Sequence, residues 1–507
     1  MNKIIPVLNS CNIDSNFIKS VQKFSNSTAI VTSNTKITFN DLNSQIIIFF
    51  DKYKNIIEGR RIALSIYNGP LFYIFLFGIW RARGTVVLIN PESPSRDIID
   101  YMQQSHVSGL ITYDNIIEKL KNYYDKFQDQ YCHWMVERKR DVYTFSNGKK
   151  LEYAEVAHEE EALITFTSGV TGTVKGVILT HENIIHNIYS TSKLLDVLDG
   201  DKALAGGQIF HVSSFRFLLT HLLHGAEIHT LPPSNLPDII NLYINQNKIT
   251  TFSGNPYIWR MLLIRGAGTK LYPMNNLKKA TSGGMIISPF LVHKILLTFP
   301  EIKFYNLYGL TEGTSIVTIL DHSKAARKAG SIGVPIPDVE CRIKNVGINK
   351  EEGELLIKGP IIMKGYLNEQ HSSVISKDGW LHTGDIARKD DEGDYWIVGR
   401  QKEIIIRAGR NVSLLKIESI IFEMSGILDV AAIGVPDNLT GELIVVFYVA
   451  VNSFDEKNIY TYCKRMLPVY ELPRYFYKIK EIKKTCSGKI DKMYLKQYAA
   501  KLLNSQD

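Results

Sequence analysis

The sequence predicts an α/β protein built on parallel sheets, followed by a β-rich module and a small C-terminal domain. Short runs of β-branched residues alternate with helical patterns; these runs are RIALSIY (61–67), TVVLIN (85–90), GLIT (109–112) and ALITFT (162–167). Such alternation is typical of parallel sheets with crossover helices. From about residue 330, short strand patterns lie between turn residues and indicate a β-rich module. We place a domain boundary at Gln401–Lys402, which gives domains of residues 1–400 and 401–507.

Two further elements follow from local patterns. The most apolar stretch, LFYIFLFGIW at 71–80, predicts a buried helix, because it has about half of the ~20 residues that a membrane-spanning helix needs. Thr180 is expected to cap a second helix, which carries isoleucines on one face. The strand ALITFT leads directly into a glycine-rich loop, and ligands of such folds lie at the carboxyl ends of strands.

The composition is that of an ordinary globular protein, with 45% hydrophobic and 22% charged residues in 507. The net charge of +8 suits an anionic ligand such as a nucleotide, or reflects a lysine-rich surface. No basic run is interleaved with aromatic residues, so we expect no nucleic-acid partner. The five cysteines show no C-x-x-C spacing and the N-terminus does not read as a signal peptide, which favours a cytoplasmic protein without a disulfide framework or a zinc site.

The loop FTSGVTGTVKG (166–176) has the composition of a phosphate-binding segment. Glycines let backbone N–H groups approach oxygens, hydroxyls donate hydrogen bonds, and a lysine supplies a charge. The P-loop motif is excluded by spacing, since Lys175 is followed by Gly176 and not by Ser or Thr. An ordinary Ser/Thr/Gly loop is the alternative. The candidate phosphate-binding residues are Thr167, Ser168, Gly169, Thr171, Gly172, Thr173 and Lys175.

Six segments in order resemble motifs of the adenylate-forming enzymes. They are TSGVTGTVKG (167–176), YGLTE (308–312), GELLIKGP (353–360), GWLHTGD (379–385), GRQKEIIIRAGRNVS (399–413) and TCSGKIDK (485–492). The resemblance also includes LINPESPSRD near the N-terminus and covers nearly the whole chain. Within the superfamily, the chain is similar to acyl- and aryl-CoA synthetases of the 4-coumarate–CoA ligase type. This resemblance implies a large N-terminal domain of two doubly wound α/β subdomains plus a small β-barrel. It also implies a small mobile α+β C-terminal domain.

The resemblance also implies a two-step reaction. ATP activates a carboxylic acid as an acyl-adenylate with release of pyrophosphate, and a thiol, most often coenzyme A, then displaces AMP. The implied cofactors are ATP, Mg²⁺ and coenzyme A or the phosphopantetheine arm of a carrier protein. Two alternatives stay open, a stand-alone ligase that loads an acyl- or peptidyl-carrier protein and a catalytically silent nucleotide-binding relative. We expect no membrane span and a monomer or homodimer.

Each motif receives a role from this resemblance. Lys489 corresponds to the catalytic lysine that bridges the attacking carboxylate and the α-phosphate. Thr311 is expected near the α-phosphate, and Glu312 as a ligand of Mg²⁺. Asp385 is expected to accept hydrogen bonds from the ribose hydroxyls, and Arg400 to contact the ribose or a phosphate.

The adenine and the domain rotation involve other positions. Tyr308, followed by Gly309, is expected to stack on the base, and Gly283 and Gly284 to let the backbone of SGGM (282–285) pass close to it. Lys402 corresponds to the family's hinge. Rotation about this hinge is expected to bring the strand near Gly409 to a pantetheine tunnel.

The segment IFHVSSF (209–215) indicates the class of acid. Family members that activate α-amino acids carry an Asp at the position of His211, where it pairs with the substrate ammonium group. We therefore expect an acid without an α-amino group, such as a small aryl or short- to medium-chain acid, with His211 also among the catalytic residues. Phe215, Met285 and Leu310 complete the predicted pocket, while Arg216 faces either a second carboxylate or solvent.

Overall fold

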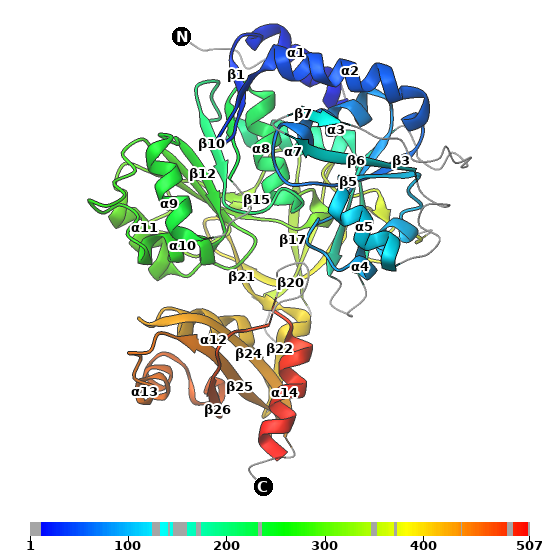
Figure 1. Cartoon of the computed structure of the whole chain (residues 1–507). Coiled ribbons are helices and arrows are strands. Elements are labelled where there is room, and N and C mark those ends of the chain that lie inside the picture. The colour runs from blue at the N-terminus through cyan, green and yellow to red at the C-terminus, as the bar shows by residue number, and fades with distance from the viewer. Residues whose placement is uncertain are drawn as a thin grey trace.

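The computed structural model describes residues 12–123, 132–139, 142–144, 160–168, 174–231, 236–345, 352–369, 373–437, 439–483 and 490–504. The chain forms a large N-terminal domain and a smaller C-terminal domain, which lies below it in Figure 1. No helix within these ranges is long and apolar enough to cross a bilayer.

One sheet of the N-terminal domain has the order β19-β9-β8-β4-β3-β5-β6-β7 in the described residues. Its strands are β3 (Arg61–Ser65), β4 (Thr85–Leu88), β5 (Gly109–Tyr113), β6 (Cys132–Lys139), β7 (Val142–Thr144), β8 (Glu161–Ser168), β9 (Val174–Thr180) and β19 (Gly365–Tyr366). The pairs β4–β8, β3–β4, β3–β5 and β5–β6 are parallel, and β9 returns antiparallel beside β8. The predicted strands at 61–67, 85–90, 109–112 and 162–167 are therefore confirmed.

The second sheet has the order β16-β15-β14-β13-β12-β10-β11-β1-β2. Its strands are β1 (Thr28–Val31), β2 (Lys36–Thr38), β10 (Lys202–Ala205), β11 (Glu227–His229), β12 (Thr251–Gly254), β13 (Lys279–Gly283), β14 (Lys303–Tyr308), β15 (Thr318–Leu320) and β16 (Val334–Pro335). In this order β10 and β12 are neighbours. From β10 the chain continues to β11 on one side of this pair, and from β12 it continues to β13 on the opposite side. Such a reversal opens a crevice at the carboxyl ends of the two strands, which is where ligands of doubly wound sheets bind.

Helices cover and separate the two sheets (Figure 1). They are α1 (Ile13–Phe24), α2 (Phe39–Ile57), α3 (Pro70–Arg81), α4 (Ser95–Gln104), α5 (Asp114–Tyr123), α7 (His181–Ser192), α8 (Val212–Leu223), α9 (Pro237–Gln246), α10 (Pro256–Ile264) and α11 (Pro289–Thr298). Residues 72–80 of α3 are all buried, as the apolar run predicts. Thr180 caps α7 with a capping box to Asn183, which confirms the predicted helix start.

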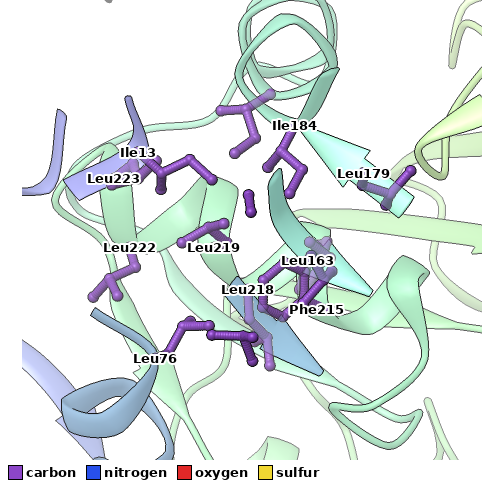
Figure 2. Close-up of a cluster of buried hydrophobic side chains, with 14 of the residues drawn as sticks. Ile13, Leu76, Leu163, Leu179, Ile184, Phe215, Leu218, Leu219, Leu222 and Leu223 are labelled. Carbon is purple, nitrogen blue, oxygen red and sulfur yellow. The ribbon is translucent and has the colours of Figure 1, made fainter. Parts of the chain in front are cut away.

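A hydrophobic core joins the sheets through α8. Residues 214–223 of this helix are all buried; its phenylalanines and leucines pack into the core, while the polar Arg216 and Thr220 hydrogen-bond within it. Figure 2 shows leucines of α8 beside Leu76 of α3, Leu163 of β8 and Ile184 of α7. The second sheet is thus anchored to the sheet whose strand β8 leads into the glycine-rich loop.

The β-rich module is a four-stranded antiparallel sheet, β17-β18-β20-β21, in the described residues. Its strands are β17 (Glu340–Asn345), β18 (Glu352–Lys358), β20 (Leu381–Lys389) and β21 (Tyr395–Arg400). Pairing runs from β17 through β18 and β20 to β21 in the described residues, and the small β-barrel that the resemblance implies stays a prediction.

After β21 the chain continues with the 3₁₀ turn η2 (Gln401–Glu403). The elements that follow are β22 (Ile404–Arg407), β23 (Arg410–Ser413), α12 (Leu414–Phe422), β24 (Ile427–Asp437), β25 (Gly441–Ala450), α13 (Lys457–Met466), η3 (Val469–Glu471), β26 (Tyr475–Lys478) and α14 (Lys492–Asn504). The predicted boundary falls at η2 and stays a prediction.

Arg260 of α10 connects the two domains. Its Nη2 donates hydrogen bonds to the carbonyl oxygens of Met424, at 3.1 Å, and Ile427, at 2.7 Å. The guanidinium also lies 3.9 Å from the ring centroid of Phe422. These carbonyls follow the C-terminal end of α12, where a cation is favourable.

Replacing this arginine is expected to loosen the domain contact. Arg260→Met should speed proteolytic cleavage within 401–403 several-fold, because a helix-end cation is worth about 0.3–1 kcal/mol and the variant also loses the ring contact. The measurement is limited proteolysis followed by mass spectrometry. Arg265→Met is the matched control, since Arg265 follows the same helix and its exposed side chain lies 3.9 Å from Asp238. Equal cleavage rates for the two variants would refute a latching role.

Candidate functional site

The carboxyl ends of β13 and β14 bring two predicted segments together. Gly283 pairs with Leu307 in parallel register, so SGGM lies beside YGLTE. A Cβ on Gly283 would lie 3.0 Å from the Leu307 carbonyl oxygen, and Gly284 has φ +80°. Both positions therefore need glycine, one for close packing and one for its left-handed backbone.

A hydrogen-bonded chain joins three predicted residues from three strands. The Tyr308 hydroxyl donates to Asp385 Oδ2 at 2.7 Å, and Arg400 Nε donates to Asp385 Oδ1 at 2.8 Å. Asp385 and Arg400 face each other across the β20–β21 ladder. Asp385 is 3% exposed, and the more exposed guanidinium of Arg400 balances its charge.

Electrostatics reinforce this chain. Burial and the neighbouring carboxylate of Asp385 raise the pKa of Tyr308 well above its usual value, so the phenol remains a donor. The charge of Asp385 likewise raises the pKa of Arg400. The arrangement presents an oriented carboxylate, an aromatic ring and a cation at one edge of the sheet.

The segment after Tyr308 turns sharply. A Cβ on Gly309 would lie 1.4 Å from the Ser315 carbonyl oxygen, so no side chain fits there. Thr311–Gly313 form the 3₁₀ turn η1, and Thr314 and Ser315 follow with φ of 53° and 90°. Positive φ in non-glycine residues stores backbone strain and is common at functional sites. The turn presents Thr311 and Glu312 half-exposed beside the end of β14.

Glu312 and Lys175 are both held by a segment that sequence reasoning did not select. The Tyr366 hydroxyl donates to Glu312 Oε1 at 2.8 Å, and Lys175 Nζ lies 4.3 Å from the Tyr366 ring centroid. Lys175 also pairs with Glu369 at 3.0 Å. Tyr366 and Glu369 lie in GYLNE (365–369), which has no periodicity or motif spacing that would single out either residue.

Glu312 suits a magnesium ion carried by phosphates. Among the residues that the structure describes, no group of three or more His, Cys, Asp or Glu side chains could hold a metal ion by itself. Mg²⁺ usually takes one or two protein carboxylates and fills its other positions with water and substrate phosphates. A single oriented, half-exposed carboxylate therefore fits the ion in that mode.

The predicted acid-binding residues divide into two groups. The first group lies at the surface. His211 is the exposed N-cap residue of α8, and Met285 is 54% exposed. Leu310 is half-buried and immediately precedes Thr311. Phe215 is buried in the core, where its ring packs against Trp80 with centroids 6.3 Å apart. The structure thus places Phe215 between the layers, because it lies one helical turn after His211 on a helix enclosed on all sides.

Arg216 faces neither of the two partners that the sequence left open. It is 2% exposed, and its Nη1 donates to the hydroxyls of Thr191 and Thr220 at 2.8 and 3.2 Å. Burial lowers its pKa to about 9. It is therefore a core residue between α7 and α8.

The remaining predicted residues lie partly outside the description. Gly169, Thr171, Gly172, Thr173 and Lys489 fall outside the described residues, as do the side chains of Ser168 and Lys402. The Thr167 hydroxyl lies 3.5 Å from the Lys175 carbonyl oxygen on β9. Ala408 and Gly409 form the two-residue loop of the β22–β23 hairpin with φ of 49° and 73°. This is the geometry of a type I′ turn, which explains the glycine through its backbone and not through crowding.

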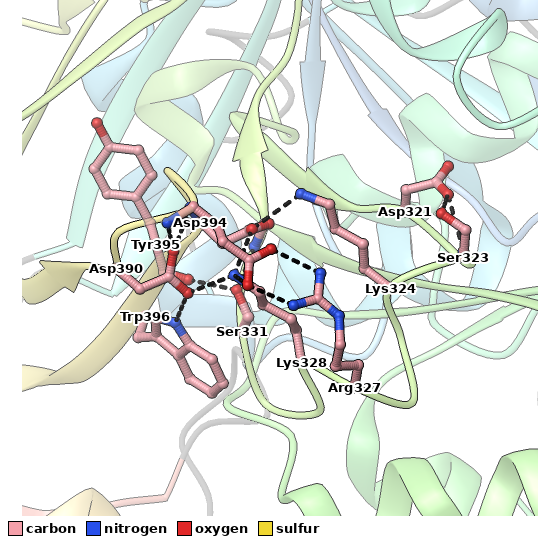
Figure 3. A network of polar contacts seen from close by, with 12 residues as sticks. Asp321, Ser323, Lys324, Arg327, Lys328, Ser331, Asp390, Asp394, Tyr395 and Trp396 are labelled. Atoms are coloured by element: carbon pink, nitrogen blue, oxygen red, sulfur yellow. Dashed lines mark hydrogen bonds and ion pairs between the residues drawn. The ribbon is translucent and has the colours of Figure 1, made fainter.

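An ion network braces the hairpin that carries Asp385 and Arg400 (Figure 3). Lys328 Nζ, 6% exposed, lies 2.8 Å from Asp390, 3.3 Å from Glu392 and 3.0 Å from Asp394. The carboxylates lie in the β20–β21 turn, whereas Lys328 belongs to the segment between β15 and β16. Ser331 extends the brace, because its hydroxyl donates to the Tyr395 carbonyl oxygen at 2.8 Å.

Comparison with known proteins gives the family. A model of the AMP-binding enzymes matches residues 17–367, and a model of the AMP-binding enzyme C-terminal domain matches residues 416–489. The chain belongs to the AMP-binding enzymes. The predicted superfamily is therefore confirmed, and with it the fold class, a mixed α/β chain with a large N-terminal domain and a smaller C-terminal domain.

Named relatives cover nearly the whole chain of this AMP-binding enzyme. A long-chain-fatty-acid–CoA ligase of Bacillus subtilis is 28% identical over 93% of this chain and 91% of its own. A 2-succinylbenzoate–CoA ligase of Bacillus cytotoxicus is 28% identical over 92% and 95%. Among solved structures, an anthranilate CoA ligase in complex with anthranoyl-AMP has a TM-score of 0.86 at 20% identity, covering 97% of this chain and 98% of that one. This last similarity shows the shared fold.

The ion network should make stability depend on pH. The hydrogen bond from Arg327 lowers the pKa of Glu392 to about 2; burial alone would raise the pKa of Asp390, but hydrogen bonds with Lys328 and Trp396 lower it. Carboxylates with depressed pKa values stabilise the fold above about pH 5, and this contribution is lost as the pH falls towards about 2.

Lys328→Met should therefore lower the urea midpoint of unfolding at pH 7. The difference in midpoint between this variant and the wild type should become smaller as the pH falls from 5 to 2. Urea unfolding at several pH values measures it. Lys52→Met, at an exposed lysine over the ring of Tyr53, is the control and should show no pH-dependent gap. A gap for Lys328→Met that is constant with pH would contradict the electrostatic account.

Proposed function

We propose that this chain activates a carboxylic acid without an α-amino group as its acyl-adenylate and transfers the acyl group to coenzyme A. The chain is an ATP-dependent, AMP-forming acid–thiol ligase, as its family membership indicates, and this class uses ATP, Mg²⁺ and coenzyme A. The observation that carries the proposal is the Tyr308–Asp385–Arg400 chain, which joins three distant motifs beside the half-exposed Glu312.

The nucleotide would bind along this chain. We assign the ribose hydroxyls to Asp385, whose ionised oxygens are good acceptors, and the ribose or a phosphate to Arg400. Tyr308 would stack on the adenine beside the backbone of Gly283 and Gly284. Support comes from the adjacency of β13 and β14 and from the orientation of Asp385 by two donors.

The phosphates would extend from there to the loop between β8 and β9. Thr311 would meet the α-phosphate, and the loop residues with Lys175 would hold the β- and γ-phosphates. Bound to Glu312 and the phosphates, Mg²⁺ would neutralise charge that repels an incoming carboxylate. Lys489 would bridge that carboxylate and the α-phosphate and so fix their approach.

The acid would enter near His211, Met285 and Leu310. A neutral or cationic imidazole offers no anion to an α-ammonium group, which favours acids without one. The named relatives are ligases of long-chain fatty acids and of 2-succinylbenzoate. Phe215 is left out of this pocket, because its ring lies in the core.

The second step would need a rotation about Lys402. The 3₁₀ turn η2 separates β21 from β22, and the β22–β23 hairpin ends in the exposed Ala408–Gly409 turn, which would approach the thiol. Coenzyme A is the acceptor of the named relatives, and the arm of a carrier protein is the second candidate.

A cytoplasmic location and a monomeric or dimeric state complete the proposal. The five scattered cysteines support a reducing compartment. Cys341 and Cys463 are free thiols in the structure, and burial raises the pKa of each to about 12.

An ATP–pyrophosphate exchange assay tests the function. The panel holds aryl, fatty, dicarboxylic and amino acids with Mg²⁺, and thioester formation is then measured with coenzyme A or a carrier protein. Exchange with one class of non-amino acid is the expected result. Exchange with α-amino acids only would overturn the acid assignment, and ATP binding without any exchange would indicate the silent relative.

Lys489→Ala is expected to slow adenylation roughly 100-fold or more, which is the usual cost of removing one preorganised transition-state donor. Thiolysis of a supplied acyl-adenylate should be nearly unchanged, because AMP leaves without this contact. Lys483→Ala is the control, since Lys483 lies over the Tyr494 ring at 4.6 Å. Equal losses in both steps would remove the assigned role.

Asp385→Asn is expected to raise the KM for ATP about tenfold, because it replaces a charged acceptor with a neutral one. Steady-state exchange at varied ATP measures this change. Asp378→Asn is the control, since Asp378 accepts a hydrogen bond from Ser376 in an exposed turn. An unchanged KM would place the ribose elsewhere.

A further inference from the structure

Residues 361–369 form a strap that joins Glu312 to the strand carrying Lys175. At one end, Ile361 O accepts a hydrogen bond from the Thr314 hydroxyl at 2.6 Å, and Met363 N donates to Glu312 O at 2.8 Å. At the other end, Leu367 N donates to Gly176 O at 2.8 Å. The middle of the strap is β19, which pairs antiparallel with β9.

Gly176 shows how closely the strap follows β9. A Cβ on this glycine would lie 2.2 Å from Leu367 Cδ1, so a larger residue would push the Leu367 side chain out of its place against β9. The strap is therefore held in place beside the start of β9. The glycine-rich loop proposed to bind the phosphates connects β8 to this end of β9.

Tyr366 projects from this strap to both charged groups. It is 8% exposed, its hydroxyl donates to Glu312 Oε1 at 2.8 Å, and its ring lies 4.3 Å from Lys175 Nζ. One rigid side chain thus holds an anion at its polar tip and a cation over its face. The pairing of Lys175 with Glu369 keeps that cation near the ring.

We propose that Tyr366 is a positioning residue for metal-bound ATP: its hydroxyl orients the Glu312 carboxylate towards Mg²⁺, and its ring seats Lys175 for the phosphates. This inference rests on the role proposed above for Glu312. A phenol is well suited to the task, because it donates one hydrogen bond and leaves the other carboxylate oxygen for a cation.

The two parts of the side chain have separable effects. Tyr366→Phe keeps the ring under Lys175 and removes only the hydroxyl, whereas Tyr366→Leu removes both. A merely structural tyrosine would affect binding with and without metal alike. The metal-dependent part of ATP binding is therefore the diagnostic quantity.

The test is calorimetric binding of an ATP analogue with a methylene group between the α- and β-phosphates, which prevents adenylation. Each protein is titrated with Mg²⁺ and again with EDTA, and the ratio of the two dissociation constants gives the gain due to metal. Tyr366→Phe should reduce this gain roughly fivefold or more with metal-free binding unchanged, as expected for loss of a hydrogen bond to a charged group. Tyr366→Leu should weaken metal-free binding as well.

Tyr395→Phe is the matched control, because Tyr395 is also buried and its hydroxyl donates to the Cys341 carbonyl oxygen at 2.8 Å. Tyr395→Phe should keep the full gain in affinity for the analogue that Mg²⁺ gives the wild type. Glu312→Gln should abolish most of the gain, and the double variant Glu312→Gln/Tyr366→Phe should be no worse, since the hydroxyl acts only through that carboxylate.

The outcomes distinguish the inference from the proposed function. If Glu312→Gln abolishes the gain and Tyr366→Phe keeps it, Tyr366 is not a positioning residue although Glu312 is the metal ligand. If neither variant changes the gain, the role of Glu312 fails and the inference fails with it. Absence of analogue binding to the wild type would overturn the proposed nucleotide site itself.

Discussion

The carboxylate of Asp385 is the contact on which the candidate site depends. It accepts hydrogen bonds from Tyr308 of β14 and from Arg400 of β21, and it is almost fully buried. A buried carboxylate is costly unless donors and a cation compensate it, so these three side chains stabilise one another in one arrangement. Because Arg400 ends β21 and η2 follows directly, the same contact also positions the segment at the predicted domain boundary.

Rigid supports surround this contact on two sides. The Lys328 network holds the β20–β21 turn against the segment after β15, and the close approach of Gly309 to Ser315 fixes the turn that presents Glu312. Charged networks and strained turns rigidify a site when every member is satisfied. His211 and Met285, which are proposed to lie at the acid pocket, are by contrast exposed.

Sequence reasoning succeeded where the signal is local. Apolar runs and β-branched segments located α3 and the strands β3, β4, β5 and β8, and Thr180 was correctly assigned as a cap. The motifs predict Tyr308, Asp385 and Arg400 as site residues, but they do not indicate that the three side chains contact one another. Reasoning failed for Phe215, which lies in the core, because a short sequence window does not show that a helix is buried on all sides.

The sequence by itself determined the family, the α/β class and the residue types that suit phosphates, a metal ion and a ribose, since these depend on local pattern and on chemistry at motif positions. Only the tertiary structure decided which side chains meet. Tyr366 and Glu312 are 54 positions apart, and Tyr308 and Asp385 are 77 apart. Arg216, which the sequence left facing either a carboxylate or solvent, points into the core because α7 packs against its helix. Long-range packing sets such orientations, and no local periodicity encodes them.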